Sequence, residues 1–309
     1  MKTVDSNFFP GWVRKSITFT IDDGNVRLDR KFLDITEPAG LKGTFNLNTP
    51  LKRLDAQGYR DFYQGYEITN HCKYHAYGFT KETTREIRNE PFDRETADKA
   101  CLYPAEESEG LYRIYTYNWC YVATNDAYLQ CTKDATEELE SVFGKGTIRD
   151  YVWPCGEQKN AALIEKLKAQ GGFRSLRKTG CVADASGFSL PSDRLAWSYN
   201  ANNTNMRELS KKYDEYPDDG ELKFFCFGVH SHDFEKADNW DVLEDFCRDL
   251  GNRPNDFWYA CVGEIFDYED AVKALKISDA EIANESAIDV YVKIDGQPAV
   301  IKAHSTYPL

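Results

Sequence analysis

The chain has 309 residues, which is enough for one barrel-sized domain or for two smaller ones. Its formal net charge is -13 at pH 7 and it has no long run of Lys or Arg, so we expect neither nucleic acid nor an anionic membrane surface as a partner. No apolar run approaches the ~20 residues that a membrane-spanning helix needs.

The cysteines indicate a reducing environment. There are nine of them, an odd number with irregular spacing and no C-x-x-C pair. This pattern favours free thiols over a disulfide framework. The first residues, MKTVDSNFFPGW, contain no apolar stretch of signal-peptide length. The expected location is therefore the cytoplasm, although a chain whose signal peptide has been removed would show the same pattern.

Short strands alternate with helices along most of the chain. Residues 16–21 are apolar at every second position and predict a strand, and residues 222–232 are almost wholly apolar, as expected of a strand buried on both faces. This alternation predicts a parallel sheet or an α/β barrel over residues 1–276. Further strands are expected at 43–49, 66–71, 147–156 and 256–262, and helices at 30–38, 80–90, 134–144, 160–172, 240–251 and 264–276.

Two regions depart from this alternation. Residues 91–130 mix Pro, Gly and acidic residues with a strand-like, Tyr-rich stretch, and we interpret them as an insertion that overhangs the rim of the barrel and narrows the substrate cleft. Near the end of the chain, apolar residues alternate on both sides of Asp295-Gly296, which is a strong hairpin signal. Residues 277–309 are therefore expected to form a small β extension packed on the barrel.

Acids and histidines follow the predicted strands at the point where each strand ends. Asp22 and Asp23 end the first strand, and His230 ends the long apolar strand. His71 and His75 follow the third strand at spacing i, i+4, which would place both imidazoles on one face of a helical turn. The carboxyl ends of barrel strands form the face that carries active sites, so these side chains are expected to meet at one rim.

Each of these patterns has an ordinary alternative explanation. Asp-Asp-Gly after a strand is often a turn or a helix cap. An isolated H-x-x-x-H is a weak metal signal, and H-S-H could be a core histidine with an exposed neighbour. Their joint occurrence at three strand ends predicts a metal site, in which the ion would also stabilise two adjacent ionised acids.

Four motifs resemble those of the polysaccharide deacetylase family, carbohydrate esterase family 4. SITFTIDDG resembles the family motif T-F-D-D-G, and YEITNHCKYH resembles G-x-E-I-x-N-H-[ST]-x-x-H, with Cys72 where Ser or Thr is usual. YVWPCGEQ resembles the R-x-P-Y-G turn, and FFCFGVHSH resembles the last motif, a strand that ends in a catalytic His. The resemblance covers most of the chain except about residues 91–130, and it extends to a bacterial branch with W-P-x-G in the third motif and a C-terminal β extension.

The resemblance implies the fold and the metal ligands. The fold would be α/β, a distorted (β/α) barrel of the polysaccharide deacetylase type over residues 1–276, with the C-terminal β-hairpin extension at 277–309. Asp23, His71 and His75 would hold one divalent ion, usually zinc, with cobalt or nickel as alternatives. Three protein ligands leave positions open for water and substrate, which is typical of a catalytic metal site.

The resemblance also implies catalytic roles. Asp22 would be the general base that takes a proton from the attacking water, and His230 would be the general acid that protonates the leaving amine. The backbone N–H of Cys155 would help to stabilise the oxyanion. A nucleophilic Cys155 thiol is an alternative, because histidines lie nearby.

Besides Cys72, the sequence departs from the family pattern at three positions. Val152 replaces the Arg that normally orients the base, and Arg177 is the first candidate to substitute for it, with Arg149 as the second. Cys155 replaces an aromatic residue, but only its backbone N–H is needed. His232 occupies a place where Tyr is common, so it is either a substrate contact or a neutral neighbour.

The predicted function is removal of acetyl groups from N-acetylated sugars or polysaccharide. A metal polarises the poorly electrophilic amide carbonyl and lowers the pKa of water towards ~7, and a neighbouring carboxylate can then act as base. The expected partner is an N-acetylated carbohydrate substrate. Two alternatives remain open: an amidase acting on a small non-peptide C–N bond, and a catalytically silent carbohydrate-binding protein on the same barrel.

Overall fold

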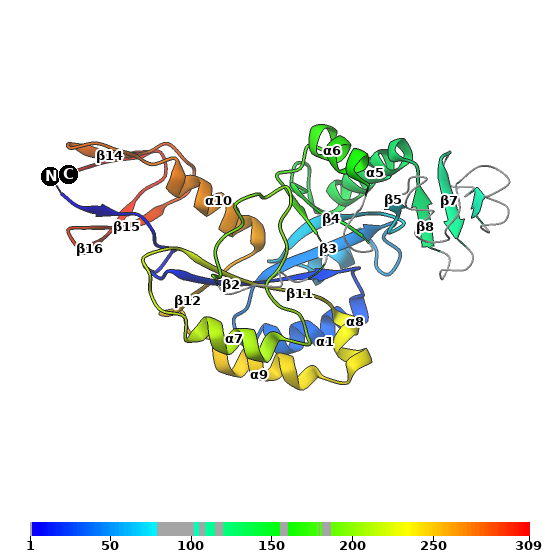
Figure 1. The fold of residues 1–309 in the computed structure, drawn as a ribbon, viewed down its shortest axis with the longest axis horizontal. Coiled ribbons are helices and arrows are strands. Elements are labelled where there is room, and N and C mark those ends of the chain that lie inside the picture. Colours follow the sequence, from blue (N-terminus) through cyan, green and yellow to red (C-terminus); the bar gives the residue numbers. More distant parts are fainter. Residues whose placement is uncertain are drawn as a thin grey trace.

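A parallel sheet forms the centre of the molecule. The computed structural model describes residues 2–78, 102–104, 109–114, 120–154, 160–178, 180 and 187–309. Within these residues seven parallel strands form one sheet, in the order β10-β9-β4-β3-β2-β11, with β12 also paired to β2 (Figure 1). The strands are β2 (Lys15–Asp22), β3 (Gly43–Thr49), β4 (Glu67–Lys73), β9 (Asp150–Val152), β10 (Ser175–Arg177), β11 (Lys223–His230) and β12 (Phe257–Tyr259).

Strand β2 lies between β3 and β11 in this sheet and is buried on both faces. Strand β11 pairs with it along its whole length, while β12 and β3 share its other edge, β12 near its start and β3 near its end. The polar positions of its alternating pattern are small hydroxyl residues that find partners inside the protein. The Ser16 hydroxyl donates to the Lys223 carbonyl at 3.1 Å, and the Thr20 hydroxyl accepts from Asn46 at 2.7 Å.

An irregular segment closes the gap between the two edge strands. Trp197 forms a parallel bridge to Arg177 of β10, and Ala201, four residues later, forms one to Phe227 of β11. The curled sheet thereby becomes a distorted barrel, as the sequence predicted. Gly228 of β11 makes this closure feasible, because a Cβ there would lie 2.1 Å from the ring of Tyr199 in the closing segment.

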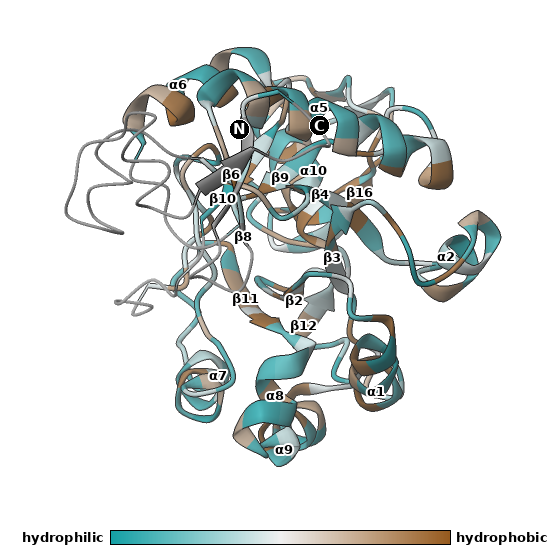
Figure 2. Cartoon of the chain, turned by 90° about the vertical axis from the view of Figure 1, so that its right-hand side faces the viewer, coloured by the Kyte–Doolittle hydropathy of each residue, from teal (hydrophilic) through white to brown (hydrophobic). Residues whose placement is uncertain are grey.

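Helices surround the strands (Figure 2). Helix α1 begins earlier than its apolar pattern suggested, because the side chain of Asn25 caps its first turn. Helix α5 likewise begins nine residues before the expected start at 134, at a cap formed by Thr124. The helices are α1 (Val26–Thr36), α2 (Ala56–Phe62), α5 (Asn125–Phe143), α6 (Ala161–Gln170), α7 (Met206–Asp214), α8 (Ser231–Ala237), α9 (Trp240–Leu250) and α10 (Val262–Lys273).

Aromatic residues fill the largest core, between the sheet and helices α1 and α9. Phe19 of β2 contacts Phe32 of α1 edge to face, with ring centroids 5.0 Å apart. Phe227 of β11 contacts Phe246 of α9 in the same way at 5.0 Å. These rings are almost completely buried, so much of the high aromatic content serves packing.

The C-terminal extension is a β structure built from both ends of the chain. Strands β15 (Val290–Ile294) and β16 (Gln297–Ile301) form the predicted hairpin, and its turn residues Asp295 and Gly296 both have positive φ. Strand β1 (Val4–Asp5) adds to β15, which local sequence patterns did not indicate. A second small sheet contains β13 (Lys276–Ile277), β14 (Glu281–Asn284) and β17 (Ser305–Pro308).

A separate four-stranded sheet follows the segment that contains His71 and His75. Its strands, in the order β5-β8-β7-β6, are β5 (Tyr77–Gly78), β6 (Leu102–Pro104), β7 (Leu111–Ile114) and β8 (Cys120–Ala123). Strand β5 comes directly after the turn that ends β4, so this sheet continues from the carboxyl end of the barrel (Figure 1). The expected helix at 80–90 and much of the insertion at 91–130 lie outside the described residues. The last residues of the expected insertion belong to α5.

Among the described residues, no helix is both long enough and apolar enough to span a membrane.

Candidate active site

Because of the register of the central strands, the polar residues at their carboxyl ends lie side by side. Asp22 is the last residue of β2, and it lies opposite Asn46 of β3 on one side and His230 of β11 on the other. His71 lies near the end of β4, the next strand along. The rim predicted from the sequence therefore gathers side chains from four neighbouring strands.

Asp22 is a buried carboxylate with two strong donors. The guanidinium of Arg177 forms an ion pair with it, and the Asn46 amide donates at 2.6 Å. Burial acts to raise the pKa of Asp22, but the positive charge of Arg177, followed by His71 and His230, lowers it further than burial raises it. The net result is a pKa below the ordinary value, so Asp22 is ionised at neutral pH.

The two candidate substitutes for the missing motif arginine lie in different places. Arg177, in β10, is 1% exposed and packs its guanidinium over the ring of Tyr199 at 5.2 Å while it contacts Asp22. Arg149 is half exposed and pairs with Asp267 of α10. The first candidate, Arg177, is therefore the one that contacts Asp22, the predicted base.

We expect Arg177→Met to lower both the stability and the turnover of the protein. It would leave Asp22 as an uncompensated buried charge, which typically costs about 3–5 kcal/mol of unfolding free energy. Arg149→Met is the matched control, because it breaks a partly exposed pair worth about 1 kcal/mol or less. Thermal or denaturant unfolding of both variants measures the difference. Equal losses in the two variants would contradict the role assigned to Arg177.

Asp23 and two histidines form a cluster whose ligand atoms all lie within 4.8 Å of one another. The Oδ1 atom of Asp23 is 3.5 Å from His71 Nε2 and 3.3 Å from His75 Nε2. His71 Nδ1 contacts the carbonyl of Val152 at 3.0 Å, whereas its buried Nε2 has no hydrogen-bond partner in the described part of the chain. A carbonyl on Nδ1 leaves the Nε2 lone pair free, which is the usual arrangement of a metal-binding histidine.

The two histidines meet through a left-handed turn. The expectation of a helical turn was wrong, because β4 runs through His71 to Lys73 and the backbone then folds back on itself. Cys72, Tyr74 and His75 all have positive φ, at 63°, 61° and 50°. The Tyr74 N–H donates to the Thr49 carbonyl at 2.6 Å and holds this turn against β3. The imidazole centroids of His71 and His75 lie 4.9 Å apart as a result.

The protonation states suit a divalent ion. Burial lowers the pKa of His75 to about 4, and the neighbouring His71 adds to this effect, so the His75 imidazole is neutral at pH 7. Burial acts to raise the pKa of Asp23, but its close approach to His71 and the charges of the neighbouring histidines lower it well below its ordinary value. Metal ions bind ionised carboxylates and neutral imidazoles, so these three residues fit the predicted site.

His230 is held in place by an acid that the sequence analysis missed. Asp233 accepts from the backbone N–H of His230 at 3.0 Å and contacts its Nδ1 at 2.9 Å. Burial acts to lower the pKa of His230, but the bond to Asp233 and the charges of Asp22 and Asp23 raise it to about 9. His230 is thus protonated at neutral pH. The signal for Asp233 was its spacing, three residues after the residue that caps α8, which is the spacing of a capping box.

A pocket of about 300 Å³ opens beside this cluster. Asp23 and His232 form part of its wall, and the remaining lining comes mostly from the end of β3 and the loop that follows it. The polar residues among these are Asn25, Asn48, Lys52, Arg53 and Tyr59. Such a lining can hydrogen-bond a hydroxylated ligand next to the candidate metal site.

The predicted roles of Cys155 are not tested by the structure. Cys155 lies outside the described residues, so its backbone N–H and its thiol stay predictions.

Comparison with known proteins identifies the class. A sequence profile described as polysaccharide deacetylase matches residues 13–172, just over half of the chain. The chain belongs to the polysaccharide deacetylase family and is an enzyme of that class, as its motifs predicted. No curated protein matches it.

Several solved structures resemble the chain at low sequence identity. Peptidoglycan deacetylase PdaC from Bacillus subtilis has a TM-score of 0.45 at 12% identity, covering 84% of this chain and 94% of that one. A family 4 acetyl xylan esterase from Clostridium thermocellum, in complex with cobalt, has a TM-score of 0.44 at 13% identity, covering 82% and 91%. The chitin deacetylase from Colletotrichum lindemuthianum has 0.42 at 12%, covering 80% and 85%.

Proposed function

We propose that the protein is a metal-dependent hydrolase that removes acetyl groups from N-acetylated sugars or polysaccharide. The observation that carries the proposal is the buried Nε2 of His71, which has no hydrogen-bond partner among the described residues and lies beside Asp23 and His75, next to the buried pair of Asp22 and Arg177. Asp23, His71 and His75 would hold the ion. Zinc is the first choice for two imidazoles and one carboxylate, and cobalt and nickel are the alternatives.

Asp22 would act as the general base. When bound, the ion would polarise the acetamide carbonyl and lower the pKa of the attacking water. The Asp22 carboxylate lies on the residue before the ligand Asp23 and is kept ionised by Arg177, so it can accept a proton from that water. Asn46 and Arg177 both bond its Oδ1 atom, which fixes the direction of the carboxylate.

His230 would act as the general acid. An amine is a poor leaving group unless it is protonated as the C–N bond breaks. His230 is protonated at neutral pH and Asp233 holds its Nδ1, so Nε2 is the atom that carries the proton to the sugar nitrogen. The backbone N–H of Cys155 would hydrogen-bond the oxyanion, as its place in the third motif implies.

Acetate release tests this proposal. The purified protein is incubated with acetylated chito-oligosaccharides, and with O-acetylated sugars for comparison, as isolated, after chelation and after zinc is restored. We expect acetate from the N-acetylated substrates, lost on chelation and recovered with zinc. Metal binding without acetate from any acetylated sugar would contradict the proposal, and would favour the amidase or the silent carbohydrate-binding protein.

A further inference from the structure

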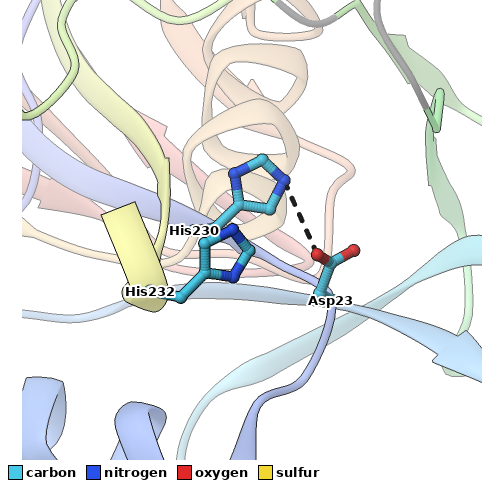
Figure 3. Close-up of side chains that lie close together, drawn as sticks. All are labelled: Asp23, His230 and His232. Carbon is cyan, nitrogen blue, oxygen red and sulfur yellow. Dashed lines mark ion pairs between the residues drawn. The ribbon is translucent and has the colours of Figure 1, made fainter. Parts of the chain in front are cut away.

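Asp23 faces two different pairs of histidines. Its Oδ1 atom lies near His71 and His75, whereas its Oδ2 atom is 3.7 Å from His230 Nε2. Figure 3 shows the second pair, with the rings of His230 and His232 beside the Asp23 carboxylate. Asp23, His230 and His232 each offer a ligand atom within 4.8 Å of the others, as Asp23, His71 and His75 do.

The second group has the supporting contacts of a metal site. Asp233 contacts Nδ1 of His230 at 2.9 Å and so orients this imidazole, and it also lies 3.6 Å from Nε2 of His232. Carboxylates placed behind histidines in this way are typical of metal centres, where they fix the ring and raise its basicity. The rings are stacked, with centroids 4.7 Å apart and planes 19° apart. All three side chains are partly exposed, at 25–34%, so an ion can reach them from solution.

We propose that Asp23, His230 and His232 bind a second divalent ion, which shares Asp23 with the first ion and inhibits the enzyme. The inhibition rests on the proposed function, because His230 can donate a proton only while its Nε2 carries one. An ion that binds Nε2 displaces this proton to solvent and occupies the lone pair that held it. The second ion binds more weakly than the first, since the two positive charges repel each other across a shared carboxylate.

Metal counting tests the site without reference to activity. The protein is stripped of metal and titrated with zinc by calorimetry, and with cobalt by visible absorption. We expect a tight first equivalent and a weaker second one. In His232→Gln the second equivalent should weaken by ~10-fold or more, since losing even a supporting partner of a metal ligand costs 10–100-fold. His304→Gln is the matched control, because His304 is exposed in the C-terminal extension, away from the barrel rim.

The inhibition is measured as a ratio within each variant. Acetate release with one equivalent of zinc is compared with release in excess zinc, for the wild type, His232→Gln and His304→Gln. We expect the wild type and His304→Gln to lose activity in excess zinc, and His232→Gln to need a higher zinc concentration for the same loss.

Binding of a single equivalent of zinc by the wild type, or binding of two equivalents with unchanged affinity by His232→Gln, would overturn the second site even if the enzyme proves to be a deacetylase. Two equivalents without inhibition would overturn the inhibitory role. If the wild type binds two equivalents of zinc as expected but releases no acetate at any zinc concentration, only the proposed function is overturned.

Discussion

Asp23→Ala should abolish metal binding and acetate release together. Asp23 is the acid of the cluster that it forms with His71 and His75, and its negative charge offsets the cost of placing a divalent ion beside one buried and one partly buried imidazole. Loss of a ligand should weaken metal binding by more than the ~10–100-fold that loss of a supporting partner costs. Without the ion, the acetamide carbonyl is not activated, so turnover should fall to background.

Elemental analysis and acetate release on the purified variant measure both effects. Asp34→Ala is the matched control, because Asp34 is an exposed acid on α1, the helix that follows the site, and the change should alter neither quantity. Unfolding curves show whether the variant is folded. A folded Asp23→Ala protein that still binds the first equivalent of zinc at wild-type affinity would exclude Asp23 as a ligand.

Asp22→Asn should lower the turnover of the enzyme without weakening metal binding. Asn has the shape of Asp and can still accept hydrogen bonds from Arg177 and Asn46, but it cannot take a proton from water. The metal should stay, while turnover falls by ~10²-fold or more, the usual size of a general-base contribution. Asp22 makes this separation feasible because its Oδ1 is bound by Arg177 and Asn46, whereas the histidine cluster is built on Asp23.

The measurements are zinc content and the turnover number at saturating substrate, with Asp34→Asn as the control. If Asp22→Asn loses zinc as fully as Asp23→Ala, both acids are ligands and the assignment of the base is wrong. If it stays fully active, another group is the base, and His230 and His232 are the next residues to test.

The sequence by itself determined the elements and the chemistry at their ends. A period-two pattern located the first of the central strands and an almost wholly apolar run located β11, and Asp22, Asp23, His71 and His230 stand at or near the last residues of three of the strands. This was predictable because strand periodicity and strand ends are local properties, and because parallel strands place their carboxyl ends at one rim. The Asp295-Gly296 hairpin was predictable for the same reason, since the turn depends on two adjacent residues.

Only the tertiary structure decided between Arg177 and Arg149. Both follow helices at similar points in the pattern, and it is the pairing of β10 with β9, next to β4, that sets Arg177 against Asp22. Strand order in a sheet depends on packing between segments far apart in the chain, which no local pattern records. The pairing of β1 with β15 was hidden for the same reason.

The backbone conformation of the turn between His71 and His75 was also a tertiary result. The i, i+4 spacing of His71 and His75 fits a helical turn, but Cys72, Tyr74 and His75 adopt positive φ instead. Left-handed backbone is unfavourable for such residues, so local preference argued against the observed turn. The hydrogen bond from Tyr74 to Thr49 of the neighbouring strand helps to compensate for that cost. A contact between two strands, which no stretch of sequence contains, therefore sets the geometry of the candidate metal site.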